Sequence, residues 1–499
     1  MIHLKDQQDI ELSKCAPENF EISDSAWIKG LNTMQAAQAF VSTIIGAGVV
    51  SIPYVFAQAG YVVGILMHLV MIATLNFSVH LLLKSREYSG FESYGEIAYI
   101  CLGRPSVFIT NFIITSATSL IVVMYGMLFS NICASFAYNI YNSHQISIQD
   151  NTLAMIFTSK LLYIILLFLI LLPFVIKKSI KDLNIAGKIL FFGLTSLIVL
   201  LFAKINFKSQ LSSPNDKVVE PYKYGTLADS SFIVMTAYGF MMSFFSIFTQ
   251  LQVKTESNGF KSLIIGMLAC FAIFMILSTL AVTLYGNNLQ PNLFDNIQVE
   301  ANAASLIMRI LFLPIFVFNA PFVFLAGKES LLMIIDDLTS DFISNSIKKR
   351  LEFLKKQKMS SQNDNQWEAP IFERQDENNA NGDLPNDNEV NNQRQHISER
   401  MSNKIYYPTA VALFVTQMFL SYVINDITII IGFFTAIAES SVNFILPGLC
   451  FIMSSRMTDK KINVLSLIGS YIYVVIGVCL FFFAMYRNIM KIKRTVASI

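Results

Sequence analysis

Residues 42–60, STIIGAGVVSIPYVFAQAG, decide the fold. They lie inside an apolar segment long enough to cross a bilayer, yet they include Gly46, Gly48, Pro53 and Gly60, which all interrupt helices. In hydrocarbon, irregular backbone is tolerated only where its unpaired N–H and C=O groups face protein, water or a ligand. The stretch therefore predicts a membrane helix that is broken near its middle.

The composition of the whole chain indicates an integral membrane protein. Of its 499 residues, 54% are hydrophobic and 14% are charged, whereas soluble domains carry about 25% charged residues. The net charge of +2 gives no indication of nucleic-acid binding, and the spacing of the six cysteines fits no metal site. The polar N-terminal residues lack the apolar core of a signal peptide, so we expect the first spanning helix to direct insertion.

Apolar runs of about 20 residues, the length that crosses a hydrocarbon core, recur along the chain. The runs are too long for barrel strands and do not alternate between polar and apolar residues. We therefore expect an all-α membrane protein with about eleven spanning helices. Their predicted ranges are 35–59, 62–83, 106–140, 153–176, 184–205, 230–252, 262–285, 303–326, 405–424, 428–452 and 463–486.

The distribution of Lys and Arg places the N-terminus in the cytoplasm, because the short loops on that side then hold most of these residues. The basic C-terminal tail, with Arg487, Lys491, Lys493 and Arg494, is the exception, since the same orientation puts it outside.

Residues 360–403 are rich in Asn, Gln, Asp and Glu and poor in apolar residues. Such a segment cannot bury enough apolar area to offset the entropy lost on ordering. We expect it to belong to a disordered cytoplasmic insert, 345–403. The insert would either bind regulatory partners or serve as a passive linker.

The glycines of Gly46-Ala47-Gly48 allow the chain to leave helical geometry without a Cβ clash. The freed backbone groups could bind the carboxylate and ammonium of a zwitterion, and the following half-helix presents its positive dipole end. Ser42 and Thr43, one turn earlier, offer hydroxyl groups. The alternative is that the small residues simply let two unbroken helices pack closely.

A transporter built from inverted repeats should have a second broken helix at the matching position of its second half. If five helices form a repeat, the partner of the first span is 230–252, where Gly239 lies at mid-depth. The flanking aromatic rings suit the wall of a pocket for an apolar side chain, although they could also simply pack between helices. The predicted substrate-binding residues are Thr43, Ile45, Gly46, Ala47, Gly48, Val49, Tyr238, Gly239 and Phe240.

Five segments carry a family resemblance. They are IIGAGVVSIPYVFAQAG (44–60), FESYGEIAYICLG (91–103), LAVTLYG (280–286), NAPFVFLAGKES (319–330) and IIGFFTAIAESSVNFILPGLCFIM (430–453). In this order they resemble motifs of the amino acid/auxin permease family, most closely its sodium-coupled neutral amino acid transporter branch. The resemblance covers nearly all of 35–485 outside the insert.

The resemblance implies a leucine-transporter-like fold of two inverted five-helix repeats and an eleventh helix, with substrate at the unwound parts of helices one and six. It implies cotransport of a small or neutral amino acid with sodium or protons, and no other cofactor. The expected division of the chain is a cytoplasmic N-terminal segment (1–34), a first repeat (35–205), an extracytoplasmic loop (206–229), a second repeat that contains the insert (230–452), and the eleventh helix with the tail (453–499).

Two polar positions bear on the coupling ion. The sodium-coupled relatives have an Asn four residues before the first glycine, where this chain has Ser42. They have a Thr two residues before the eighth-helix proline, where this chain has Asn319. Both positions keep an oxygen, the ligand atom that hard cations prefer. Ser42 and Asn319 are therefore the candidate sodium ligands, and the two departures leave sodium and protons both open.

A glutamate near the middle of 428–452 is a second candidate for ion coupling. A carboxylate at mid-bilayer costs about 2.5–3.5 kcal/mol, so Glu439 is expected to have a function. Asn443 lies four residues further along, on the same helical face. We expect Glu439 to take up and release the coupled proton or to offset a cation. The alternative is a neutral, hydrogen-bonded acid that holds helices together.

Three further polar residues lie in predicted spans. Arg309, near the outer end of its span, is expected to extend its charge to the outer interface. His68 and His80 have no obvious partner in the sequence, and we expect both to pack between helices or lie at the interface.

Together these features predict a secondary active amino acid transporter that works by alternating access in a plasma, vacuolar or lysosomal membrane. The chain has no G-x-x-x-x-G-K-[ST] loop for ATP hydrolysis and no nucleophile–base grouping, so it is not expected to be an enzyme. One alternative is a transporter-like sensor that binds an amino acid and signals through its cytoplasmic segments. The other is a channel, which would need a continuous polar pore.

Overall fold

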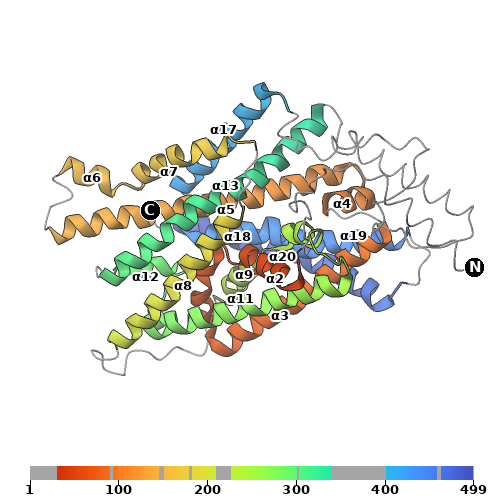
Figure 1. The fold of residues 1–499 in the computed structure, drawn as a ribbon, viewed down its shortest axis with the longest axis horizontal. Coiled ribbons are helices and arrows are strands. Elements are labelled where there is room, and N and C mark those ends of the chain that lie inside the picture. Colours follow the sequence, from red (N-terminus) through yellow and green to blue (C-terminus); the bar gives the residue numbers. More distant parts are fainter. Residues whose placement is uncertain are drawn as a thin grey trace, which may run out of the picture.

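The computed structural model describes residues 31–89, 94–144, 151–178, 183–208, 226–299, 303–339, 401–457 and 462–497. Every regular element within these ranges is a helix, and most of the long ones run side by side in a bundle (Figure 1). The all-α prediction is thus confirmed for these parts of the chain. The predicted segments 1–34, 206–229 and 345–403 lie almost wholly outside the described residues and stay predictions.

The quoted stretch forms a broken helix followed by a turn into the next one. α2 (Thr33–Ile44) ends before the glycines, a short 3₁₀ segment η2 (Ala47–Ser51) follows, and α3 (Ile52–Ser89) begins directly after it. Within α3, Gly60 has φ 74° and ψ 166°, so α3 is two helices that meet at a kink. Glycine adopts this positive φ without a Cβ clash, and the kink falls between the predicted spans 35–59 and 62–83.

The remaining predicted spans are also helical, but several contain interruptions. One is the break between α6 and α7, which bends by 57°. Two short helices, α4 and α12, had no counterpart among the predicted spans. The elements are α4 (Tyr94–Leu102), α5 (Pro105–Ser143), α6 (Thr152–Thr158), α7 (Lys160–Val175), α8 (Leu183–Lys208), α9 (Leu227–Ala237), η5 (Met241–Ser243), α10 (Phe244–Phe248), α11 (Glu256–Tyr285), η6 (Gly286–Asn288), α12 (Leu293–Val299), α13 (Ala303–Thr339), α17 (Asn403–Val423), α18 (Ile427–Phe434), η7 (Thr435–Ile445), α19 (Leu446–Ser455) and α20 (Val464–Ala497).

By length and composition, seven of the described helices could cross a membrane, or eight if the bent pair α6–α7 is one span. Their outer faces carry large exposed apolar side chains, among them Val62, Phe112 and Phe482, as expected for surface that contacts lipid. A multi-pass membrane protein is therefore confirmed. The count of eleven spans and the division into two repeats stay predictions.

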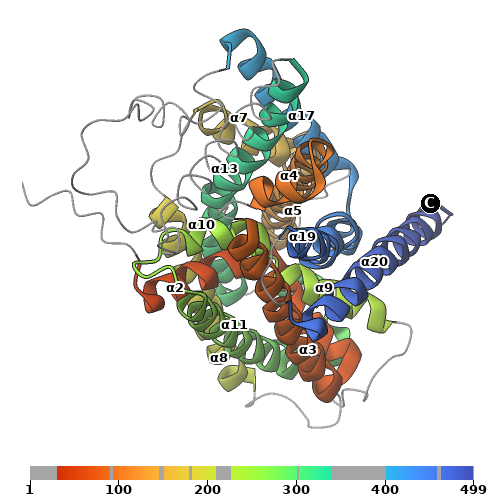
Figure 2. The ribbon, with the colours of Figure 1, turned by 90° about the vertical axis from the view of Figure 1, so that its right-hand side faces the viewer.

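Burial separates the central helices from the peripheral ones. The apolar window of the helix that runs from α18 through η7 to α19 is 78% buried, whereas that of α20 is only 17% buried. An end-on view agrees, because α19 lies among the other helices and α20 extends from the side of the bundle (Figure 2). The segment that carries Glu439 is therefore among the most enclosed parts of the molecule.

A buried lysine joins three helices at one end of α13. Lys328 is 1% exposed, and its ammonium donates to the carbonyl oxygens of Val175 (3.0 Å) and Lys177 (2.8 Å) and to the Tyr406 hydroxyl (2.6 Å). Carbonyl groups at a helix C-terminus lack partners within the helix and carry partial negative charge. Lys328 therefore caps α7 and fixes it against α13 and α17.

Candidate functional site

The first break lies where the sequence predicts it. The last helical residue of α2 is Ile44, Ile45 has φ −76° and ψ 90°, and Gly46 has φ −124° and ψ −152°. Both residues are extended, so the helical hydrogen-bond pattern stops at this point. The Val49 N–H then bonds the Gly46 carbonyl (3.2 Å) at the start of η2. The alternative of an unbroken, closely packed helix is wrong.

The second break is longer than its single glycine implies. α9 ends at Ala237, and the chain turns through Tyr238, Gly239 and Phe240 before the short η5 and α10. The Phe240 N–H bonds the Tyr238 carbonyl (2.8 Å), which is not a helical pattern. The predicted interruption at Gly239 is thus present.

The two breaks pack directly against each other. A methyl group at Gly48 would lie 3.2 Å from the Ala237 Cα and 3.5 Å from its nitrogen, so η2 approaches the end of α9 backbone to backbone. One turn before the first break, the Phe40 ring meets the Phe240 ring edge to face, with centroids 5.8 Å apart. Tyr238 and Phe240 are fully buried. The structure therefore brings the predicted residues of the first and sixth spans together.

Glu439 lies at the second break. It is 2% exposed, and its Oε1 would lie 2.8 Å from a methyl group placed on Gly239. Its Oε2 accepts a hydrogen bond from the Asn443 side chain, and the Asn443 carbonyl accepts one from the Ser78 hydroxyl. The predicted pair of Glu439 and Asn443 is therefore in contact, next to Gly239.

The backbone around Glu439 is a π-helix, η7 (Thr435–Ile445). Such segments are rare and are frequently found at functional sites. Two hydroxyls join its start to α9: Thr435 Oγ1 lies 3.1 Å from Thr236 Oγ1 and 3.2 Å from the Phe232 carbonyl. No sequence pattern predicted this element, because a π-helix has no periodicity distinct enough to read in one chain.

His68 has a partner that the sequence did not reveal. Its Nδ1 lies 3.1 Å from the Tyr238 hydroxyl, and its ring stacks on Phe56 at 5.6 Å. The His68 side chain is fully buried, with 0% exposure. The expectation of a packing residue is confirmed, and the contact adds a link between α3 and the second break. Only the tertiary fold could show it, because 170 residues separate the two.

The other polar candidates have mixed outcomes. His80 is partly exposed, as expected of an interface residue, and its Nδ1 lies 3.5 Å from Glu256 Oε1. The Ser42 hydroxyl donates to the Gln38 carbonyl (3.0 Å), and that of Thr43 to the Ala39 carbonyl (2.9 Å). Asn319, which is half-buried on α13, takes part in neither hydrogen bond. A sodium site between Ser42 and Asn319 therefore stays a prediction.

The expectation for Arg309 is wrong. Its side chain is 1% exposed and does not extend to an interface. Its guanidinium instead lies over the Phe136 ring, 4.6 Å from the centroid, and donates to Ser135 Oγ (2.8 Å). The long side chain is held by α5 rather than by lipid headgroups.

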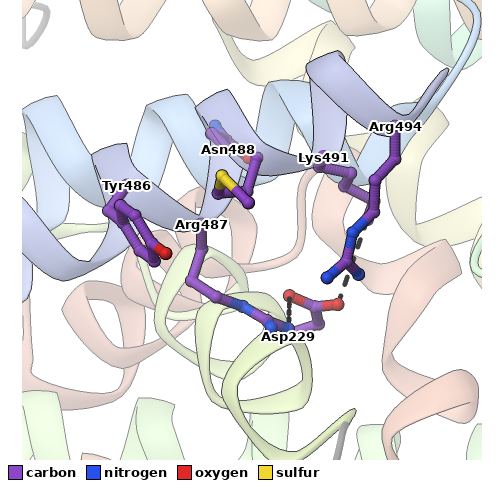
Figure 3. A pocket seen from close by; sticks show the side chains of 7 residues that line it. Asp229, Tyr486, Arg487, Asn488, Lys491 and Arg494 are labelled. Carbon is purple, nitrogen blue, oxygen red and sulfur yellow. Dashed lines mark hydrogen bonds and ion pairs between the residues drawn. The ribbon is translucent and has the colours of Figure 1, made fainter. Parts of the chain in front are cut away.

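At one end of the bundle, ion pairs join the starts of α9 and α18 to α20. Asp229, in the first turn of α9, lies 3.2 Å from Arg487 and 4.0 Å from Lys491 (Figure 3). Lys491 also lies 3.7 Å from Asp426, the N-cap of α18, and donates to Thr428. Two basic residues of the C-terminal tail, Arg487 and Lys491, thus neutralise acids of neighbouring helices.

Comparison with known proteins gives one match over nearly the whole chain and two over a short part of it. The sequence model of the family described as transmembrane amino acid transporter protein matches residues 29–490. Two proteins provisionally named sodium-coupled neutral amino acid transporter 11 are similar over a shorter stretch. The Bos taurus protein is 35% identical over 79 residues, and the Mus musculus protein over 78 residues. Each stretch covers 15% of this chain and only 17% of the relative's length.

Proposed function

The chain belongs to the family of transmembrane amino acid transporter proteins, and on this premise we propose that it is a secondary active transporter of small or neutral amino acids, rather than an enzyme. It works by alternating access across a plasma, vacuolar or lysosomal membrane. Its substrate lies between the two breaks, and a proton or a sodium ion supplies the driving force. The contact between η2 and the end of α9 is the observation that carries this proposal.

The two breaks offer both charges of a zwitterion a partner. The ends of α2 and α9 leave carbonyl oxygens without helical partners, which suits an ammonium group. The starts of η2 and η5 present backbone N–H groups and the positive end of a helix dipole, which suits a carboxylate. Tyr238 and Phe240 would form the wall for a small apolar side chain.

Glu439 is the coupling group in this proposal. Its carboxylate contacts the second break at Gly239, so a change of its charge acts where substrate is held. Proton uptake there would remove a negative charge from an enclosed site, and release on the other side would restore it. Ser42 and Asn319 remain the candidate ligands if sodium is the coupling ion. The neutral, structural role of Glu439 is the competing account.

The proposed architecture has eleven spans in two inverted repeats. The first repeat runs from α2 to α8, the second from α9 to α19, and α20 is the additional helix. Two features support this division. Each proposed repeat begins with a broken helix, and the two broken helices pack against each other, as inverted repeats require for a shared site.

Uptake by purified protein in liposomes tests the proposed function. We expect labelled neutral amino acids to accumulate above the external concentration when a pH or sodium gradient is imposed, and the effective gradient identifies the ion. Uptake that only equilibrates without saturation would favour a channel. Saturable binding without accumulation under either gradient would contradict transport and favour an amino acid sensor.

A further inference from the structure

An open cavity whose lining includes several polar side chains lies apart from the two breaks. It has a volume of about 820 Å³, within the usual range for small-molecule sites. It lies where the C-terminal half of α5, the end of α6 and α12 meet, which Figure 1 shows on one side of the bundle. Among its lining residues are Asn131, Ser135, Asn139, Asn142, Thr158 and Gln298.

The lining of this cavity offers neutral hydrogen-bonding groups. Its amide and hydroxyl side chains both donate and accept, and none of the described residues that line it is charged. The Asn139 amide donates to the Gln298 carbonyl (3.4 Å), which ties the α5 wall to the α12 wall. Such a lining is suited to a ligand with several hydroxyl, amine or ester oxygen groups.

A buried positive charge lies directly behind the wall. The Arg309 guanidinium donates through Nη1 to Ser135 Oγ (2.8 Å) and through Nε to the Ser305 carbonyl (3.2 Å). Ser135 lines the cavity. Within the parts of the chain that the structure describes, no carboxylate forms a salt bridge with Arg309, although its side chain is 1% exposed.

A buried charge is costly unless it is paired, so the lack of a carboxylate partner among the described residues favours an anion near Arg309. A guanidinium has five N–H donors, and the described contacts of Arg309 use two of them. The Ser135 hydroxyl, which now donates to the Ile132 carbonyl (2.8 Å), could turn toward a ligand. An oxyanion in the cavity would gain both the field of the guanidinium and charge-assisted hydrogen bonds.

We propose that this cavity binds an oxyanion, a phosphate or carboxylate group, whose remaining polar atoms contact the amides of α5 and α12. The group belongs either to a lipid headgroup or to a free small molecule. Lipid has access, because α6 exposes Leu153, Ile156 and Phe157 beside the cavity and Val299 on its rim is 82% exposed. A purely structural role for Arg309, as a link between α13 and α5, is the competing explanation.

Thermal unfolding of the purified full chain in neutral detergent tests the proposal. One arm titrates inorganic phosphate against sodium chloride at equal ionic strength. The other titrates phosphatidylglycerol into the micelles against phosphatidylcholine. We expect a saturable rise of a few °C in Tm with at least one probe, because ligand that binds only the folded state stabilises it. A response to phosphate alone indicates a free anion, and a response to phosphatidylglycerol alone indicates a lipid headgroup.

Variants separate binding from structure. Arg309→Gln should weaken the apparent affinity by about tenfold or more, while Arg309→Lys keeps the charge and part of the response. Asn142→Leu fills the cavity without touching Arg309 and should also reduce the response. Lys328→Gln is the matched control, because Lys328 is equally buried on the same helix but holds α7 instead. The Tm of Lys328→Gln should rise with phosphate or phosphatidylglycerol as that of the wild type does.

Three results would overturn the proposal. The first is a wild-type chain whose Tm responds to neither probe beyond its control. The second is an Arg309→Gln variant that responds as the wild type does, and the third is a Lys328→Gln variant that loses the response equally. If Arg309→Gln does not fold, Asn142→Leu decides: a reduced response supports the site, and an unchanged response contradicts it.

Discussion

At the scale of single residues, Gly48 and Glu439 define the proposed site. Gly48 lets the first break approach the backbone of the second, and Glu439 contacts the second break at Gly239. His68 supports the same place from α3 through the Tyr238 hydroxyl. All three residues lie at or beside the contact between the two breaks, so we expect substitutions of them to weaken the packing there.

Gly48→Ala tests that contact. The new methyl group would lie 3.2 Å from the Ala237 Cα, which is backbone and cannot rotate away. We expect a loss of about 1–3 kcal/mol in stability, typical of overpacking, visible as a lower Tm in detergent. Gly46→Ala is the matched control, because its methyl group would meet only the Tyr125 hydroxyl at 3.9 Å. Equal Tm values for the two variants would contradict the close approach.

At the scale of elements, glycines predicted the interruptions better than the helix lengths predicted the spans. The breaks at Gly46 and Gly239 and the turn at Gly60 follow from local backbone chemistry, so one sequence was enough to place them. The π-helix η7 and the partner of His68 depend on tertiary contacts. Arg309 was mispredicted because hydropathy shows that a charge lies in a span but not which neighbours enclose it.

The short helix α12 carries an acid whose environment should make stability depend on pH. Burial raises the pKa of Asp295 to about 6, although a hydrogen bond from Asn292 opposes the shift and the charge of Asp426 adds to it. An unfolded Asp has a pKa of about 3.9. The folded state therefore prefers the protonated acid, and its stability falls as pH rises from about 4 to about 6.

Asp295→Asn removes this dependence, because the amide carries no charge and its oxygen still accepts from Asn292 and Gln298. The variant should gain up to about 3 kcal/mol relative to wild type at neutral pH. The gain should vanish near pH 4. Thermal unfolding of both proteins across this range measures the difference. A gain that is the same at every pH would contradict a raised pKa.

At the scale of the whole molecule, the ion pairs around Asp229 join the start of α9 to α20, and Lys491 extends the link to the start of α18. Both helices go on to form the proposed site, α9 at its break and α18 through η7 to Glu439. Alternating access requires such helices to move relative to the rest of the bundle. In the proposed mechanism α20 would therefore contact the helices that move, while few of its own residues are buried.

The central claim is that Glu439 couples ion movement to amino acid transport at the two breaks. Uptake into proteoliposomes, measured for wild type and Glu439→Gln over a series of external pH values, tests it most directly. Glu87→Gln, at the exposed end of α3, is the control for an acid-to-amide change. We predict that wild type and the control respond to an imposed proton or sodium gradient and that Glu439→Gln does not. Uptake by Glu439→Gln with unchanged rate and pH dependence would contradict the account.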